Sequence, residues 1–404
     1  MRSARNAIGL VFFVNGVTFA SWSPRLPEIQ ERLGVSDTAL GITLVGAGVG
    51  GLAASLVSGR LVDRVGSRAM TVATSAALSL FLPLMGVAPS AVLVFVTLVV
   101  LGSLDGLTDV AMNAQAVELQ RRRGTSIISR FHALWSAGSV TGGILASRAA
   151  QVGLELWIQL VVTSAVLIAM TVVAGRWLLP TRRSPVHPPA ARAAPTASAS
   201  PTAAPTAATV PATIWPRAIL VRLFLIGLAV ALAEGPPNEW AALMFEDRFD
   251  VGPGAAGLGF VAVAGGMLIG RLSGDHFTDW LGPEATRRGG AALAAVGVVI
   301  ATLAPHPLVA GVGLVVTGLG LSSLFPLLFR AASELTRGSH SGMAGFSSGA
   351  RLGFLLASPA VGLIAGGTSI AVAVLIISGG AAITVAASHL PVRAERELVV
   401  TPPA

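Results

Sequence analysis

Cysteine, lysine and tyrosine are all missing from the 404 residues, and charged residues are scarce. The absence of cysteine excludes disulfide bonds, a thiolate nucleophile and cysteine-ligated metals. Charged residues make up 11% of the chain, whereas soluble domains carry about a quarter. So few charges cannot cover the surface of a 40.8 kDa globule. We infer that lipid covers much of it, in agreement with a mean hydropathy of +0.77.

The apolar residues, 53% of the chain, form runs long enough to cross a bilayer, which takes about 20 helical residues. They predict an all-α membrane protein with twelve transmembrane helices in two pseudo-symmetric six-helix halves. The approximate spans are 6–24, 38–58, 69–87, 91–117, 129–149, 155–178, 217–241, 255–273, 288–304, 308–329, 342–363 and 367–389.

A stretch rich in proline, alanine, threonine and serine separates the sixth predicted span from the seventh. It has no hydrophobic periodicity, and we expect a disordered cytoplasmic linker. The predicted domains are an N-terminal half at 1–179, the linker at 180–215, a C-terminal half at 216–390 and a cytoplasmic tail at 391–404.

All 27 basic residues are arginines, and they lie mostly between the apolar runs. That distribution fits membrane topology better than nucleic-acid binding. With a cytoplasmic N-terminus, 21 arginines, Arg271 among them, fall in cytoplasmic segments and four fall outside. The positive-inside rule then places both termini in the cytoplasm.

The two halves also share a repeat. Sliding residues 33–66 by 216 positions gives nine identities in 34 and carries Asp63 and Gly66 onto Asp279 and Gly282. The same offset carries Gly102 onto Gly318. A half repeated in parallel topology suggests a transporter with its site between the halves.

The loop after the second span resembles the G-x-L-x-D-R-x-G-x-R signature of the major facilitator superfamily. The residues that carry the resemblance are Gly59, Asp63, Arg64, Gly66 and Arg68, with a degenerate copy at Asp279 and Gly282. This resemblance implies a secondary active transporter that works by alternating access. We expect these loops to hold one gate state by pairing with neighbouring helix ends and charges.

The resemblance implies no cofactor, no metal and no enzymatic activity. The expected partners are a small-molecule substrate, protons and the lipid bilayer, with no nucleic acid, and the protein is expected to be a monomer in a bacterial cytoplasmic (inner) membrane.

A closer resemblance is to a branch of bacterial inner-membrane permeases near the proton-coupled fucose permease. Asp109 and Asn113 stand where that permease has a coupling acid and an asparagine, and His132, Trp135 and Ser136 match the polar segment of its next helix. The first span here carries Asn15 but lacks that permease's acid.

Ionisable groups at bilayer depth cost roughly 2.5–3.5 kcal/mol, so each needs an interior role. Asp105, Asp109 and Asn113 repeat every four residues and share one helix face, which we expect to point inward. Asp109 and Asp105 are candidate proton carriers, although each is also explained by an interhelical hydrogen bond, for Asp105 one to Arg351. His132 is either a proton relay or a neutral histidine bonded to a carbonyl.

Further candidates lie in the second half. Glu234, a fourth coupling candidate, and Asn238 share a face of a helix expected to break at Pro236 and Pro237. Arg351, always charged, pairs with an acid or binds an anionic substrate. Trp135 is a candidate to stack on a polar ring of the substrate, and Trp22 and Trp240 either do the same or anchor the helices at the membrane interface. The other substrate-binding candidates are the polar residues Asn15, Asn113, Ser136 and Asn238.

Proton-coupled symport of a small polar solute, such as a sugar, is favoured over proton-coupled efflux. The glycine and proline signature of antiporters is incomplete here, since only Gly138, Gly142 and Gly143 remain of it. Small residues for helix packing explain those glycines as well. A membrane enzyme or sensor is disfavoured because no P-loop, nucleophile elbow or zinc-protease motif is present.

Overall fold

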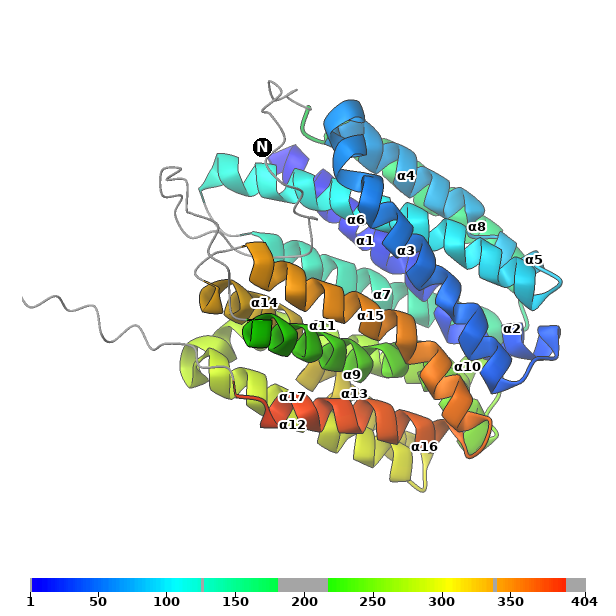
Figure 1. Cartoon of the computed structure of the whole chain (residues 1–404). Helices are drawn as coiled ribbons and strands as arrows, with labels where there is room; N and C mark the ends of the chain where they lie inside the picture. The colour runs from blue at the N-terminus through cyan, green and yellow to red at the C-terminus, as the bar shows by residue number, and fades with distance from the viewer. Residues whose placement is uncertain (1, 125–126, 181–216, 337–339, 390–404) are drawn as a thin grey trace, which may run out of the picture.

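The computed structural model describes residues 2–124, 127–180, 217–336 and 340–389, and these are almost entirely helical. The first half forms the upper layer in Figure 1. Its helices are α1 (Arg2–Ala20), η1 (Ser23–Arg25), α2 (Leu26–Leu33), α3 (Asp37–Val65), α4 (Ser67–Phe81), α5 (Leu84–Val87), α6 (Ala91–Arg123), α7 (Ile128–Gln151) and α8 (Leu156–Gly175).

The second half forms the lower layer in Figure 1. Its helices are α9 (Arg217–Phe249), α10 (Pro253–Ala256), α11 (Leu258–Leu281), α12 (Pro283–Leu303), α13 (Pro307–Leu321), α14 (Leu324–Leu335), α15 (His340–Ala365), α16 (Ile370–Val374), the π-helix η2 (Leu375–Gly379) and α17 (Gly380–Ala387). Residues 181–215 of the predicted linker and the predicted tail at 391–404 lie outside the described residues.

With the short helices that continue them, these elements make twelve passes of membrane length, as the sequence predicts. Within the described residues, eleven of the passes are also apolar enough to count as membrane spans. The remaining pass, α7, is more polar because it carries Arg130, His132 and Arg148. It packs against α1 and α11 in the interior.

The predicted repeat is confirmed by close helix crossings in the two halves. A Cβ atom on Gly50 of α3 would lie 2.1 Å from the backbone oxygen of Val99 in α6. In the second half, a Cβ on Gly266 of α11 would lie 2.1 Å from the oxygen of Val315 in α13. Both members of the pair are shifted by the same offset, since 50 + 216 = 266 and 99 + 216 = 315. Glycine is therefore required at equivalent crossings.

A second offset relates the other two innermost helices of each half. Gly16 of α1 crosses the oxygen of Trp135 in α7, and Gly227 of α9 crosses that of Phe346 in α15, each with a Cβ distance of 2.1 Å. Here 16 + 211 = 227 and 135 + 211 = 346. The sequence carries this offset too, because residues 133–149 shifted by 211 positions onto 344–360 give eight identities in 17 without a gap.

The loop glycines of the signature have equivalent backbone conformations. Gly66 between α3 and α4 has φ +92°, and Gly282 between α11 and α12 has φ +84°. L-residues with a side chain rarely adopt this region, which explains glycine at both positions.

The expected break of α9 at its two prolines is wrong, because the helix runs through Pro236 and Pro237 without interruption. Pro236 has no N–H to donate to the carbonyl of Leu232, and Ser378 of η2 donates its hydroxyl to that oxygen instead, at 3.3 Å. The structurally equivalent first pass is the one that breaks, between α1 and η1.

In the part of the chain that the structure describes, the largest hydrophobic core shared by the two halves lies at one end of the molecule. We call it the sealed end; it carries α2, α5, α10 and α16, on the right in Figure 1. One apolar cluster there contains Trp22, Leu26 and Leu40 from the first half and Trp240 and Leu243 from the second. At the opposite end, which we call the loop end because it carries Gly66 and Gly282, each half has a separate cluster of its own.

Candidate functional site

The acids of α6 lie near the middle of the helix, on the face that the four-residue spacing predicts. Asn113 donates to the carboxylate of Asp109 at 2.8 Å and to its backbone oxygen at 2.9 Å. Asp105 is accessible to solvent although it lies far from both ends of α6. The structure therefore brings these three residues together.

A chain of hydrogen bonds connects Asp105 with two further helices. Asn15 of α1 donates its amide N–H to Asp105 at 2.7 Å. The indole N–H of Trp135 in α7 donates to the amide oxygen of Asn15, also at 2.7 Å. Both ends of the buried Asn15 amide are thus used, and any rearrangement of Asp105 is transmitted to α7.

Arg271 is a site residue that sequence reasoning missed. Its assignment to a segment between the helices is wrong, because α11 extends nearly three turns beyond it and Arg271 is half-buried. Its guanidinium donates to the hydroxyl of Ser136 at 2.5 Å and lies 5.4 Å from the ring centroid of Trp135. This arginine of the second half therefore contacts α7 of the first half. The predicted span 255–273 already included it, which was the available signal.

Glu234 and Asn238 share a face of α9, as their spacing predicts. The Asn238 amide donates to the backbone oxygen of Glu234 at 2.8 Å. Glu234 interacts electrostatically with Arg271, but the two form no ion pair within 4.0 Å. Ser23 of η1 donates to the backbone oxygen of Asn238 at 3.2 Å, which adds a contact between the halves.

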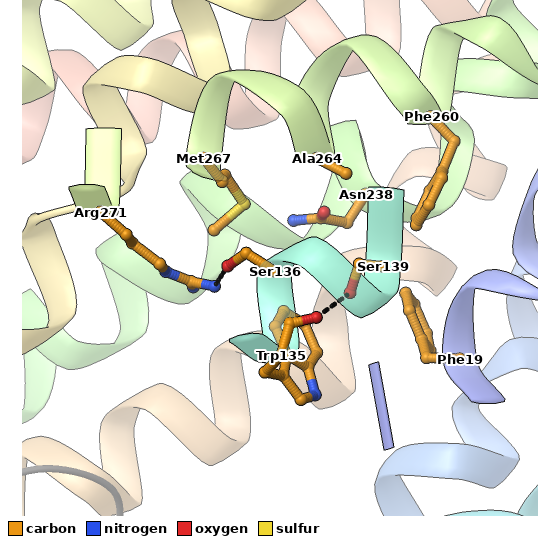
Figure 2. Close-up of a pocket in the computed structure, with 9 residues that line it drawn as sticks. All are labelled: Phe19, Trp135, Ser136, Ser139, Asn238, Phe260, Ala264, Met267 and Arg271. Carbon is orange, nitrogen blue, oxygen red and sulfur yellow. Dashed lines mark hydrogen bonds between the residues drawn. The ribbon is translucent and has the colours of Figure 1, made fainter. Parts of the chain in front are cut away.

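These helices surround a small pocket between the two halves. Figure 2 shows Arg271, Met267 and Asn238 converging on the space around Ser136. The pocket has a volume of about 10 Å³, enough for a single water molecule in this conformation. Its lining comes from α1, α7, α9 and α11, namely Phe19, Trp135, Ser136, Ser139, Asn238, Phe260, Ala264, Met267 and Arg271.

Arg351 makes a second polar contact between the halves. It projects from α15 and donates to the hydroxyl of Ser55 in α3 at 3.0 Å. Its electrostatic partner is Asp109, and the alternative that it binds Asp105 is not what the structure shows. Among the described residues no ion pair involves Arg351.

His132 lies one turn before Ser136 on α7. Its ring packs edge-on against Phe12, with centroids 5.3 Å apart. Its Nε2 atom is buried and has no hydrogen-bond partner, so the structure does not place a carbonyl against that nitrogen.

Trp22 and Trp240 belong to the apolar cluster of the sealed end. Trp240 is fully buried and donates its indole N–H to Ser358 at 3.1 Å, and Ser358 in turn donates to Glu239. Trp22 is 7% exposed and packs edge-on against Phe19. Neither tryptophan faces lipid as an interfacial anchor would.

The signature loops lie at the loop end and make few contacts. Asp63, Arg64 and Asp279 are exposed, and within the described ranges no ion pair includes them. Arg68 donates to the backbone oxygens of Gly175 at 3.0 Å and of Arg176 at 3.4 Å, at the end of α8. This contact of Arg68 with a helix end is one of the pairings that the signature predicts. At Gly59, an added Cβ would have no neighbour within 4 Å.

Comparison with known proteins supports the fold and identifies the family. The family model described as Major Facilitator Superfamily matches residues 8–345. An uncharacterized MFS-type transporter of Yersinia pestis is 30% identical over 365 residues, covering 90% of this chain and 89% of the relative. Membrane protein MosC of Rhizobium meliloti is 26% identical over 360 residues, covering 89% of this chain and 83% of MosC.

Solved structures share the same architecture at low sequence identity. The nucleoside transporter NupG superposes with a TM-score of 0.71 at 13% identity, over 95% of this chain and 98% of NupG. FucP in the outward conformation gives a TM-score of 0.62 at 14% identity, over 94% and 97%. With twelve passes in two repeated halves and a matching family model, this chain belongs to the major facilitator superfamily and is a membrane transporter.

Proposed function

We propose that this transporter is a proton-coupled symporter that moves a small polar organic solute, such as a sugar, by alternating access. The observation that carries the proposal is the cluster of acids, amides and arginines halfway along the passes, contributed by both halves. Charged groups at that depth are costly and therefore indicate function. A solved structural neighbour, the fucose–proton symporter FucP of E. coli, performs chemistry of this kind.

The conformation supports a cycle in which the halves rock about the cluster. The shared core closes the sealed end, whereas the cores of the two halves are separate at the loop end. In the alternative state the contacts at the sealed end separate and the loop end closes. The exposed Asp63 and Asp279 are then available to hold the closed loop end, as the family resemblance implies.

Asp109 is the proposed coupling residue because it interacts with a charge from the other half. When ionised, it attracts Arg351 of α15, which projects over α3 and donates to Ser55 there. Protonation removes that attraction and so changes the relative stability of the two states. Asp105, His132 and Glu234 are the further titratable groups of the same region.

The glycines of α7 do not favour efflux over symport. A Cβ on Gly138 would lie 2.2 Å from the backbone oxygen of Phe13, and one on Gly142 would lie 2.9 Å from that of Val17. Close packing of α7 against α1 accounts for both glycines, so we propose no second function.

We further propose a monomer in a bacterial cytoplasmic (inner) membrane with both termini in the cytoplasm. Moving Arg271 into the membrane leaves 21 − 1 = 20 arginines in cytoplasmic segments against four outside. This asymmetry supports placing the loop end in the cytoplasm. The small-molecule substrate, protons and lipid remain the proposed partners, without nucleic acid.

Asp109→Asn tests the coupling role, since it keeps the side-chain volume and a hydrogen-bonding group while removing the charge. We expect the variant in liposomes to exchange solute down its gradient but to lose accumulation driven by a pH gradient. Arg121→Gln, at the exposed end of α6, is the control for loss of one charge on that helix. Wild-type proton-driven accumulation by Asp109→Asn would refute the assignment.

A further inference from the structure

Among the described residues no carboxylate contacts Arg271 directly, and Glu234 of α9 acts on it from beyond ion-pair distance. A guanidinium has five N–H donors, and Arg271 uses one of them on the neutral hydroxyl of Ser136. The face of Trp135 gives a further favourable contact. Within the described residues no ion pair includes Arg271. Several donors therefore remain available in the pocket of Figure 2.

The pocket beside Arg271 offers groups that suit an anion with a small organic body. The lining contains no acid, and its polar members other than Arg271 are Ser136, Ser139, Asn238 and the indole of Trp135. Apolar walls come from Phe19, Phe260 and Met267. One turn away, the buried Nε2 of His132 has no partner, and its ring interacts electrostatically with Arg271.

We propose that Arg271 binds a carboxylate on the transported solute, so that the substrate is an organic acid of about sugar size. The inference rests on the proposed transport function and narrows its substrate class. A guanidinium fork matches a carboxylate with two parallel hydrogen bonds. Ser136 and Asn238 are placed to bind hydroxyl or carbonyl groups of the solute, and Trp135 to cover an apolar face.

Glu234 supplies the link between this site and a proton. The titratable groups that act on Arg271 are Glu234 from α9 and His132 from α7. Asp275, one turn further along α11, is exposed and forms no ion pair with Arg271. Of the other helices packed against α11, α13 carries no titratable group, whereas η1 and α12 carry Arg25, which pairs with Glu28, Arg287, which pairs with Glu284, and Arg288, which donates to the backbone oxygen of Ala386. An ionised Glu234 competes with the solute carboxylate for Arg271, and a protonated Glu234 does not. The solute anion and a proton on Glu234 are therefore expected to bind together.

The site must widen for a solute to enter. At about 10 Å³ the pocket holds one water in this conformation. Its lining comes from α1 and α7 of the first half and from α9 and α11 of the second. Movement of the halves therefore opens and closes the site, as alternating access requires.

Ligand-induced thermal shifts of the purified protein, read from its seven tryptophans, test the proposal. The probes are hexuronic, aldonic and small aliphatic or aromatic carboxylic acids, each beside its neutral parent. We expect at least one acid to stabilise the wild type while its neutral parent does not. Arg271→Gln should bind that acid roughly 10- to 100-fold more weakly, Arg271→Lys should fall between, and Arg121→Gln should match the wild type.

Glu234→Gln provides a second readout, since it should keep the affinity for the acid but lose the pH dependence that the wild type shows. Stabilisation by neutral sugars alone, no shift from any acid, or equal acid affinity in wild type and Arg271→Gln would each overturn the proposal. Proton-driven uptake of a neutral sugar alone would support the proposed symport and contradict the proposed carboxylate site at Arg271. Acid binding that depends on Arg271 without proton-driven uptake would support this binding site and contradict the proposed proton-coupled transport.

Discussion

Asn15 is the residue on which three helices of the first half depend. Its amide oxygen accepts from Trp135 in α7 and its amide nitrogen donates to Asp105 in α6. Buried polar groups cost about 1–3 kcal/mol when they lose a partner, so this arrangement is sensitive to small changes. A proton on Asp105 therefore alters a contact that also orients the indole beneath Arg271.

Two substitutions of Asp105 separate its structural role from its charge. Asp105→Asn keeps an acceptor for Asn15, and we expect its free energy of unfolding to stay within about 0.5 kcal/mol of the wild type. Asp105→Leu leaves the Asn15 N–H unpaired and should cost about 1–3 kcal/mol. Thermal unfolding in detergent measures both. Equal loss in the two variants would show that the charge, not the hydrogen bond, stabilises the region.

At the scale of the helix, glycine sets how closely the passes approach. Neighbouring positions on α11 differ completely in this respect. A Cβ on Gly265 would have no neighbour within 4 Å, whereas one on Gly266 would lie 2.1 Å from the backbone oxygen of Val315. Backbone cannot move away as a flexible side chain can, so α11 and α13 would have to separate.

Gly265→Ala and Gly266→Ala form a matched pair on one helix. The first should be neutral or should stabilise the protein by up to about 1 kcal/mol, because alanine favours helix. The second should destabilise it by about 1–3 kcal/mol through overpacking. Unfolding temperatures and the yield of folded protein provide the comparison. A stable Gly266→Ala protein would contradict the packing described for this crossing.

Hydrophobic patterning was sufficient to predict the twelve passes, and the spacing of Asp105, Asp109 and Asn113 their shared face. It did not predict features that depend on a contact with another helix. α9 continues through both prolines, and Ser378 satisfies one of the two carbonyls that they free, which no local pattern indicates. Arg271 was assigned to a loop because the counting of arginines cannot recognise one held in the interior by Ser136.

At the scale of the whole molecule, the arginines at the sealed end are bound by protein groups. Arg25, which is 3% exposed, contacts Glu28 and Gln159, and Arg248 donates to the backbone oxygen of Ala304 at 2.7 Å. Such arginines have structural roles and do not oppose the proposed orientation.

Site-directed labelling tests that orientation, because the chain has no native cysteine. Ala69→Cys places a thiol at an exposed position of the loop end, and Val152→Cys does so at the sealed end. In intact cells stripped of the outer membrane, a membrane-impermeant maleimide should label Val152→Cys, and label Ala69→Cys only after lysis. The reverse pattern would invert the topology.

Transport by rocking of the two halves requires the sealed end to open in each transport cycle. Thr38 at the start of α3 and Gly366 just after α15 lie on opposite halves there. A Cβ on Gly366 would be 3.8 Å from the Cβ of Thr38, which is the mean separation in a disulfide. We therefore expect a Thr38→Cys, Gly366→Cys double variant to form a disulfide bridge between the halves on oxidation.

The most direct measurement is solute uptake by this double variant in liposomes, before and after oxidation and again after reduction. Each single variant serves as the control for oxidation itself. We expect the bridge to abolish uptake and reduction to restore it. Undiminished uptake by fully bridged protein would contradict transport by separation of the two halves at the sealed end.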